Sequence, residues 1–213
     1  MNRVGHLGRG ESVWVGIFLY DLLLKMSEIS EDDNKKEWLL KASELKETLN
    51  TVGWDGNWYL RAFYDNGDLI GSHKNEECQI DLISQAWAIL TDVVDSKHVK
   101  KLINEVENRL VDKKVGIIKL LTPPFTGLEN NPGYISEYLA GIRENGAQYT
   151  HAALWYIMAL AKSGDSRKAY QHFSMINPAN KKTETYKVEP YVMAADVYTN
   201  PSFMGQGGWT WYT

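Results

Sequence analysis

The sequence predicts an all-α fold, an (α/α)6 toroid of which this chain forms a partial barrel, with a short β-hairpin inserted between helices. Two observations lead to this prediction. Helical segments that are apolar on most faces alternate with segments that are apolar on one face, as in the inner and outer helices of antiparallel pairs. The periodic pattern gives about six or seven helices in 213 residues, fewer than the twelve of a closed ring.

The first two helical segments show the two patterns. Residues 11–26, ESVWVGIFLYDLLLKM, are apolar on most faces and predict a buried helix between other layers. Residues 33–51 predict an amphipathic helix, because apolar residues recur at steps of three and four; these are Trp38, Leu39, Ala42, Leu45 and Leu49. At residues 64–69, YDNGDL is a turn signal flanked by β-favouring residues, which predicts the hairpin.

Four further helices are predicted after the hairpin, in segments 78–93, 96–112, 148–164 and 165–177. Gly164 followed by Asp165 is typical of a helix C-cap that leads directly into the next N-cap. The segment between the two pairs, 120–147, is rich in Pro, Gly and Asn, and a loop of that length is usually functional. No repeat or linker divides the chain, so one domain, or part of one, is predicted over residues 1–213.

Composition and charge exclude several classes of function. A formal net charge of -4 and a pI near 5.8 leave no basic stripe for a nucleic-acid partner. The absence of a long apolar run or export signal predicts no membrane segment and a cytoplasmic location. The single cysteine, Cys78, excludes an internal disulfide and is expected to be a small buried hydrophobe. Eight Trp and 12 Tyr suggest aromatic platforms for sugars, although core packing accounts for about two thirds of such residues.

Charged and polar residues gather in RENGAQYTH, where a helix is about to begin. Arg143 and Glu144 are placed on a loop and His151 on the first helical turn, where a histidine can bind an anion beside free backbone N–H groups. A structural histidine that caps its own helix is an equally good interpretation of His151. Arg143 and Glu144 could equally form a surface ion pair of little energetic value.

The C-terminal segment holds a second set of candidates. Glu189 and Asp196 are carboxylates in an apolar stretch, suited to sugar hydroxyls, to acid–base chemistry, or simply to backbone donors that hold a loop. Gly207, Gly208 and the hydroxyl of Thr213 could form a nest for an oxyanion, which is a weak signal alone. The histidines are too scattered for a metal site, and two of them are expected to face solvent, His98 and His172.

Six motifs follow one another along the chain: GRGESVWVGIFLYDLL, GWDGNWYLRAFYDNGDLIGS, ECQIDLISQAWAIL, RENGAQYTHAALW, VEPYVMAADVY and GQGGWTWYT. Their order and spacing resemble glycoside hydrolase family 94, which holds the inverting cellobiose and chitobiose phosphorylases, the β-1,2-oligoglucan phosphorylases and the C-terminal domain of cyclic β-1,2-glucan synthases. The resemblance covers essentially the whole chain, and the form QYTHAA is closest to the β-1,2-glucan branch.

The resemblance implies a six-hairpin catalytic barrel and inverting phosphorolysis of β-glucosides. Phosphate attacks the anomeric carbon directly, so one carboxylic acid that protonates the leaving oxygen suffices. The resemblance assigns phosphate binding to His151 and Thr213, and substrate binding to Arg143, Glu144 and Gln148. It implies no cofactor; inorganic phosphate is a co-substrate, and a β-glucan oligosaccharide is the other partner.

Departures from the family pattern lead to further expectations. The family's general acid belongs to a Trp-Asn-Asp motif, which would lie just upstream of Met1, and its phosphate-binding Arg is expected in the earlier half of the barrel. The Gly that follows the phosphate Thr is absent after Thr213, and Ala147 replaces a glycine that approaches the sugar. The chain is therefore expected to be a C-terminal half that is inactive alone and that self-associates or pairs with the other half.

Two alternatives to a phosphorylase remain open. A non-catalytic β-glucan-binding or scaffold module would use the aromatic residues without needing phosphate. An inverting hydrolase would use water and would need a second carboxylate as base, such as Glu189 or Asp196.

Overall fold

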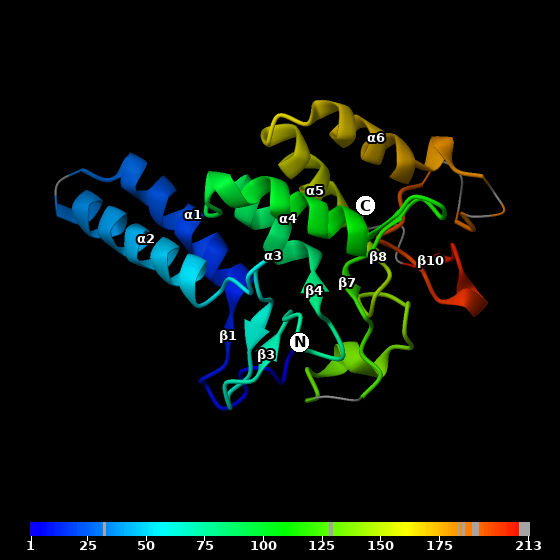
Figure 1. Ribbon diagram of the computed structural model, residues 1–213, viewed down its shortest axis with the longest axis horizontal. Helices are drawn as coiled ribbons and strands as arrows, with labels where there is room; N and C mark the ends of the chain where they lie inside the picture. The colour runs from blue at the N-terminus through cyan, green and yellow to red at the C-terminus, as the bar shows by residue number, and fades with distance from the viewer. Residues whose placement is uncertain (32, 128–129, 183, 185, 189–191, 209–213) are drawn as a thin grey trace.

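The computed structural model describes the chain except residues 32, 128–129, 183, 185, 189–191 and 209–213. In the described part the α-helices form three pairs that follow one another along the chain (Figure 1). The helices are α1 (Val13–Ile29), α2 (Asp33–Thr51), α3 (Leu82–Leu90), α4 (Ser96–Arg109), α5 (Thr150–Lys162) and α6 (Ser166–Ile176). Three short 3-10 helices accompany them, η1 (Tyr134–Glu137), η2 (Pro178–Asn180) and η3 (Pro201–Phe203).

The helices form an inner and an outer layer. Inner helix α3 packs against both α1 and α5, while α2 covers α1 and α6 covers α5. The main core lies between these layers; its largest fully buried side chains include Ile17, Leu82, Leu102, Tyr156 and Leu160. The alternation of inner and outer helices is the one that the sequence predicts, because the inner segments carry apolar residues on more faces.

Helix α1 differs from its prediction, because one of its sides is open. Val13, Ile17, Tyr20 and Leu23 are buried, as expected of an inner helix. The opposite side, described here as the open side of α1, is 44 to 51% exposed at Val15, Phe18, Leu19 and Leu22. The helix lies at the edge of the inner layer, where α2 and α3 cover only part of its surface.

The strands are all two residues long and lie at one end of the helix layer (Figure 1). They are β1 (Glu11–Ser12), β2 (Ala62–Phe63), β3 (Leu69–Ile70), β4 (Ile80–Asp81), β5 (Val111–Asp112), β6 (Ile117–Ile118), β7 (Leu121–Thr122), β8 (Gln148–Tyr149), β9 (Asp196–Val197) and β10 (Gly207–Gly208). The predicted hairpin is confirmed as the antiparallel pair β2–β3, and β1 adds a third strand to it with Glu11 opposite Phe63. The other pairs are β4–β7 and β5–β6, and β9 lies between β8 and β10.

Helix ends follow the predicted chemistry in several places. Gly164 has φ +90°, and the Asp165 side chain accepts a hydrogen bond from the Lys168 amide, which caps α6. Helices α3 and α5 begin later than predicted, because β4 and β8 take the first residues of those segments. No helix in the described part is both long and apolar enough to cross a membrane.

Candidate functional site

All three inner helices begin directly after a strand. The pairs are β1 and α1, β4 and α3, and β8 and α5, so the N-terminal ends of the inner helices lie at the same end of the molecule, beside the strands (Figure 1). The first backbone N–H groups of a helix have no partner within it, and its dipole is positive there. This end of the inner layer therefore favours ligands that carry negative charge or hydrogen-bond acceptors.

A buried ion pair lies across the first two of these helix starts. The Arg61 Nε lies 3.2 Å from Asp81 Oδ2, and its Nη1 donates to Ser12 Oγ at 3.1 Å. The guanidinium also lies 5.8 Å from the ring centre of Trp14. Asp81 is 1% exposed and caps α3 through the Ile83 amide; burial raises the pKa of its carboxyl, against the effect of Arg61. The ion pair therefore joins the Arg61 segment to the starts of α1 and α3.

The loop before β8 and the neighbouring strand β9 bring an arginine and two carboxylates together. We call Tyr138, Arg143, Glu144, Tyr149 and Asp196 the Arg143 cluster. Arg143 has φ +49°, and its Nη1 donates to Tyr138 Oη at 3.1 Å with the guanidinium 5.3 Å from that ring centre. Burial opposes its charge, but the Tyr138 hydroxyl and the nearby carboxylates of Asp196 and Glu144 raise the pKa of Arg143.

Glu144 holds the clearest sign of a ligand site. Its Oε2 atom is buried and has no hydrogen-bond partner among the described residues. Burial, and then the Glu144 carboxylate, raise the pKa of Tyr149. Leaving a buried carboxylate oxygen unpaired costs free energy, so an outside hydroxyl donor is the expected partner.

Asp196, on β9, is the second carboxylate of the cluster. It is 4% exposed, and its Oδ1 accepts a 2.6 Å hydrogen bond from the Gly208 amide. Burial raises the pKa of this carboxyl, against the effects of the Gly208 amide and of Arg143. The Gly208 amide is therefore occupied by Asp196, so it cannot serve the oxyanion nest suggested by the glycines of this segment.

His151 is the second residue of α5, on the first turn as predicted, and is exposed. Its ring lies 5.8 Å from that of Tyr149 and 6.3 Å from that of Trp155. Trp155 stacks against Trp14 at 6.4 Å and meets Trp87 edge-on at 5.5 Å, so aromatic rings join the three inner helices. The indole N–H groups of Trp14 and Trp87 are buried without a partner among the described residues.

The other predicted site residues have different positions. Gln148 is 1% exposed; its Oε1 accepts from the Ile118 amide at 3.2 Å, and its Nε2 lies 3.5 Å from Thr150 Oγ1. Its side chain is thus used to hold β8 in place, and its contact with substrate stays a prediction. Thr213 and Glu189 lie outside the described residues, so their roles also stay predictions.

The expectation that His172 faces solvent is wrong. His172 is 3% exposed, and its Nε2 lies 2.6 Å from Glu107 Oε1, which also accepts from Tyr156 Oη at 2.9 Å. The charged residues around it suggested a solvent-exposed position, but the His172 side chain faces the core. His98 is half-buried and stacks on Trp54, with ring centres 4.9 Å apart. Cys78 is fully buried, as predicted.

Sequence reasoning missed Arg61, Asp81, Tyr138 and Tyr149 as site residues. Asp81 and Arg61 carry a weak signal, since each is a charged residue within a largely apolar stretch. Only the packing of the β2–β3 hairpin against the start of α3 shows that the two are paired.

A comparison with protein families finds the Glycosyl hydrolase 94 superfamily, catalytic domain, over residues 1–213. Among curated proteins, the chain is 41% identical over 222 residues to the cyclic beta-(1,2)-glucan synthase NdvB of Rhizobium meliloti (strain 1021), covering 100% of this chain and 8% of that protein. It is 32% identical over 222 residues to the solabiose phosphorylase of Paenibacillus borealis, covering 100% of this chain and 28% of that protein. The chain thus spans a minor part of the length of these relatives.

Among solved structures, a match is found to the cellobiose 2-epimerase of Bacillus thermoamylovorans B4167. The TM-score is 0.58 at 17% identity, and the match covers 93% of this chain and 50% of that one. At this identity the likeness concerns the fold alone, an (α/α)6 barrel, and it confirms the predicted fold class.

Proposed function

The chain belongs to the glycosyl hydrolase 94 superfamily, and on this premise we propose that it supplies one side of the active site of an inverting β-glucoside phosphorylase. Relatives that are phosphorylases or a cyclic glucan synthase support a carbohydrate phosphorylase-like function. The substrates proposed for this chain are a β-1,2-linked glucan oligosaccharide and inorganic phosphate.

The observation that carries this proposal is the unpaired Oε2 of Glu144 beside Arg143 and Asp196. A glucose unit presents hydroxyl groups that donate and accept, whereas Arg143 only donates and an ionised Glu144 only accepts. Together they match the hydroxyls of one sugar. The indole N–H groups of Trp14 and Trp87 offer two further donors, and the rings offer flat apolar surface for a sugar face.

His151 has the position of a phosphate ligand in this proposal. It lies at the start of α5, where unpaired backbone N–H groups and the helix dipole also favour an anion. Phosphate held there would attack the anomeric carbon, forming a new C–O bond while the bond to the leaving sugar breaks. The leaving oxygen then takes a proton from a carboxylic acid.

We assign that acid to no residue of this chain, because the sequence has no Trp-Asn-Asp motif. We therefore expect binding of glucan and phosphate by the 213 residues, without turnover. Asp196 leaves one alternative, since a second buried carboxyl group beside Glu144 is what an inverting, water-dependent hydrolase needs as its base.

Calorimetric titration with a β-1,2-oligoglucan, with and without phosphate, tests the proposal. Glu144→Gln should weaken glucan binding by about tenfold or more, because a charge-assisted hydrogen bond contributes about 1.5–3 kcal/mol. His151→Ala should remove the effect of phosphate and leave binding without phosphate unchanged. Glu28→Gln, an exposed change at the far end of α1, is the matched control.

The outcomes separate the candidate functions. Glucan binding that does not respond to phosphate in the unmodified chain would favour a non-catalytic binding module. Release of glucose from the glucan without phosphate would favour the hydrolase. Equal glucan binding by Glu144→Gln and the unmodified chain would contradict the proposed sugar site altogether.

We also propose that the open side of α1 is the surface on which the rest of the toroid packs. Its exposed apolar residues continue the inner layer beyond α1, and the match covers half of the epimerase chain. Exposed apolar patches of this kind mark protein interfaces. The double variant Phe18→Glu with Leu22→Glu should reduce self-association of the chain, measured by analytical ultracentrifugation. Self-association equal to that of the unmodified chain would contradict the proposed interface.

A further inference from the structure

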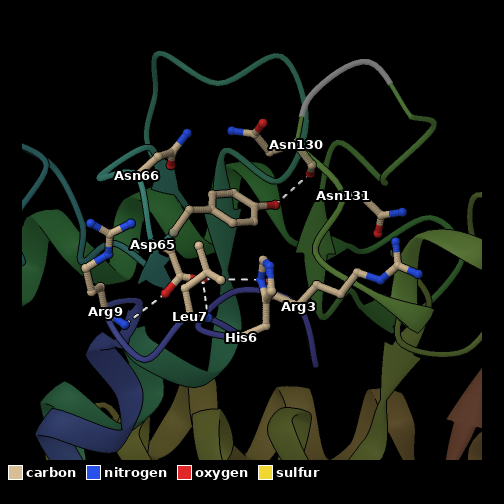
Figure 2. A pocket seen from close by; sticks show the side chains of 9 residues that line it. Arg3, His6, Leu7, Arg9, Asp65, Asn66, Asn130 and Asn131 are labelled. Atoms are coloured by element: carbon tan, nitrogen blue, oxygen red, sulfur yellow. Dashed lines mark hydrogen bonds and ion pairs between the residues drawn. The ribbon is translucent and has the colours of Figure 1, made fainter.

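A cavity of about 730 Å³ lies between three segments that are far apart in the sequence (Figure 2). Arg3, His6 and Arg9 come from the loop before β1, Tyr64 from the turn that follows β2, and Asn131 from the loop before η1. We call it the Arg3–Arg9 cavity. It is separate from the Arg143 cluster, and none of that cluster's residues lines it.

Hydrogen bonds between the three segments hold the cavity walls. The Arg3 amide donates to the Pro132 carbonyl at 3.3 Å, and the Asp65 amide donates to the Val4 carbonyl at 3.1 Å. The Tyr64 hydroxyl donates to the Asn130 carbonyl at 2.7 Å, drawn as a dashed line in Figure 2. The cavity is therefore built by tertiary contacts rather than by the surface of one loop.

Asp65 is the only acidic side chain among the described residues that line the cavity, and its hydrogen bonds are already satisfied. The Asp65 carboxylate accepts from the amides of Leu7 at 3.0 Å, Arg9 at 2.8 Å and Gly10 at 2.9 Å, and its side chain is 7% exposed. These amides, that of Leu7 first, lower the pKa of Asp65 and keep it charged. His6 Nδ1 lies 3.2 Å from Asp65 Oδ2 and 2.9 Å from the Arg3 carbonyl. His6 therefore leaves Nε2 for a ligand.

The polar side-chain groups of the cavity lining that remain available to a ligand are hydrogen-bond donors. The exposed side chains of Arg3 and Arg9 have no ion pair or hydrogen bond to a described residue, and they lie at opposite ends of the cavity in Figure 2. Asn131 Oδ1 accepts from the Gly133 amide and from Ser136 Oγ, so its Nδ2 donor remains. Asp68 lies at a neighbouring hollow, where Asn66 and Asn130 donate to its carboxylate.

One stretch of chain connects the cavity to the candidate site. Asn130 and Asn131 lead into η1, and η1 leads to Tyr138 of the Arg143 cluster. The Tyr134 amide at the start of η1 donates to Asn2 Oδ1 at 3.0 Å, which ties this stretch to the segment that carries Arg3. A glycan that occupies the Arg143 cluster could therefore extend toward the cavity along the same loop.

We propose that the Arg3–Arg9 cavity binds a sugar unit that carries an oxyanion, as a carboxylate or a phosphate ester. Arg3 and the Asn131 amide donor lie at one end of the cavity and Arg9 at the other, so the guanidinium at either end matches the acceptor oxygens of one such group, and Leu7, which is 62% exposed, offers apolar surface for the sugar ring. The choice of a sugar as the carrier rests on the proposed function; the preference for an oxyanion rests on the cavity itself.

Titrations of the full chain with four probes test this inference. Glucuronic acid and glucose 6-phosphate should both bind, and glucose and inorganic phosphate should each bind at least about tenfold more weakly. Arg3→Gln with Arg9→Gln should weaken both acidic sugars by about tenfold or more. Arg167→Gln with Lys35→Gln removes two exposed charges elsewhere and should change nothing. The two single variants serve if circular dichroism shows that the double variant is unfolded.

Three results would overturn the inference: glucose binding as tightly as glucuronic acid, inorganic phosphate binding as tightly as glucose 6-phosphate, or unchanged binding in the arginine variants. Glu144→Gln should leave the acidic sugars bound. Loss of glucan binding without loss of acidic-sugar binding, or the reverse, therefore shows which of the two proposals has failed.

Discussion

Gln85 gives the sharpest test of how the hairpin segment is attached to the inner helices. It is fully buried on α3, where its Oε1 accepts from the Tyr59 amide at 2.8 Å and its Nε2 donates to the Tyr59 carbonyl at 2.8 Å and the Asp81 carbonyl at 2.9 Å. Gln85→Met keeps the approximate volume but leaves the Tyr59 N–H and C=O buried without partners. Each unsatisfied group costs about 1–3 kcal/mol, so we expect the free energy of unfolding to fall by about 2–5 kcal/mol.

Urea denaturation followed by tryptophan fluorescence measures this change. Gln171→Met on the exposed face of α6 is the control and should change stability by less than about 0.5 kcal/mol. Gln85→Glu should also destabilise the fold near neutral pH, because a carboxylate oxygen would face the Tyr59 carbonyl oxygen. Lowering the pH should restore part of the lost stability, because the protonated carboxyl group can again donate a hydrogen bond to that carbonyl. Equal stabilities for Gln85→Met and the control would refute the proposed clamp.

Three more predictions concern backbone, charge and thiol chemistry. Gly71→Ala should cost at least about 1 kcal/mol more than Gly67→Ala: both glycines have φ near +90°, but an added Cβ at Gly71 would lie 2.5 Å from the Arg61 amide nitrogen, whereas at Gly67 it would meet nothing. Urea denaturation of both variants checks this, and equal losses would contradict it. Burial opposes the charge of Glu107, but hydrogen bonds from His172 and Tyr156 lower its pKa below the ordinary value of 4.5. The charged Glu107 carboxylate therefore stabilises the fold fully at pH values above 4.5, and this stabilisation is lost as the pH falls through the lower pKa of the folded state. Thermal unfolding between pH 6 and about pH 3 should show a flatter pH dependence for Glu107→Gln, and an unchanged slope would exclude this role. Cys78 is fully buried, so its thiol should react with a thiol reagent only at the rate of unfolding, and fast labelling of the native chain would contradict its placement.

Local patterns were sufficient to predict most of the fold. Both the amphipathic helix α2 and the β2–β3 hairpin follow from neighbouring residues. The helix is indicated by the spacing of Trp38, Ala42, Leu45 and Leu49, and the hairpin by the turn sequence YDNGDL. The open side of α1 could not be predicted in this way. Its residues are as apolar as those of the buried side, and only the position of the helix at the edge of the layer leaves them exposed.

The candidate site was only partly predictable for a similar reason. Arg143, Glu144 and His151 are close in sequence, so one motif indicates all three. The pairing of Arg61 with Asp81 and the approach of Asp196 to Arg143 depend on contacts across the fold. His172 shows the converse: its neighbours are polar, but the helical turn directs it to Glu107 in the interior.

The most direct test of the sugar site is a crystal structure of this chain grown with a β-1,2-linked oligoglucan. We predict a glucose unit at the N-terminal ends of α1, α3 and α5, with one of its hydroxyl groups within hydrogen-bond distance of Glu144 Oε2. An oligoglucan bound elsewhere on the molecule, with Glu144 Oε2 still unpaired, would contradict the assignment of the Arg143 cluster as the sugar-binding site.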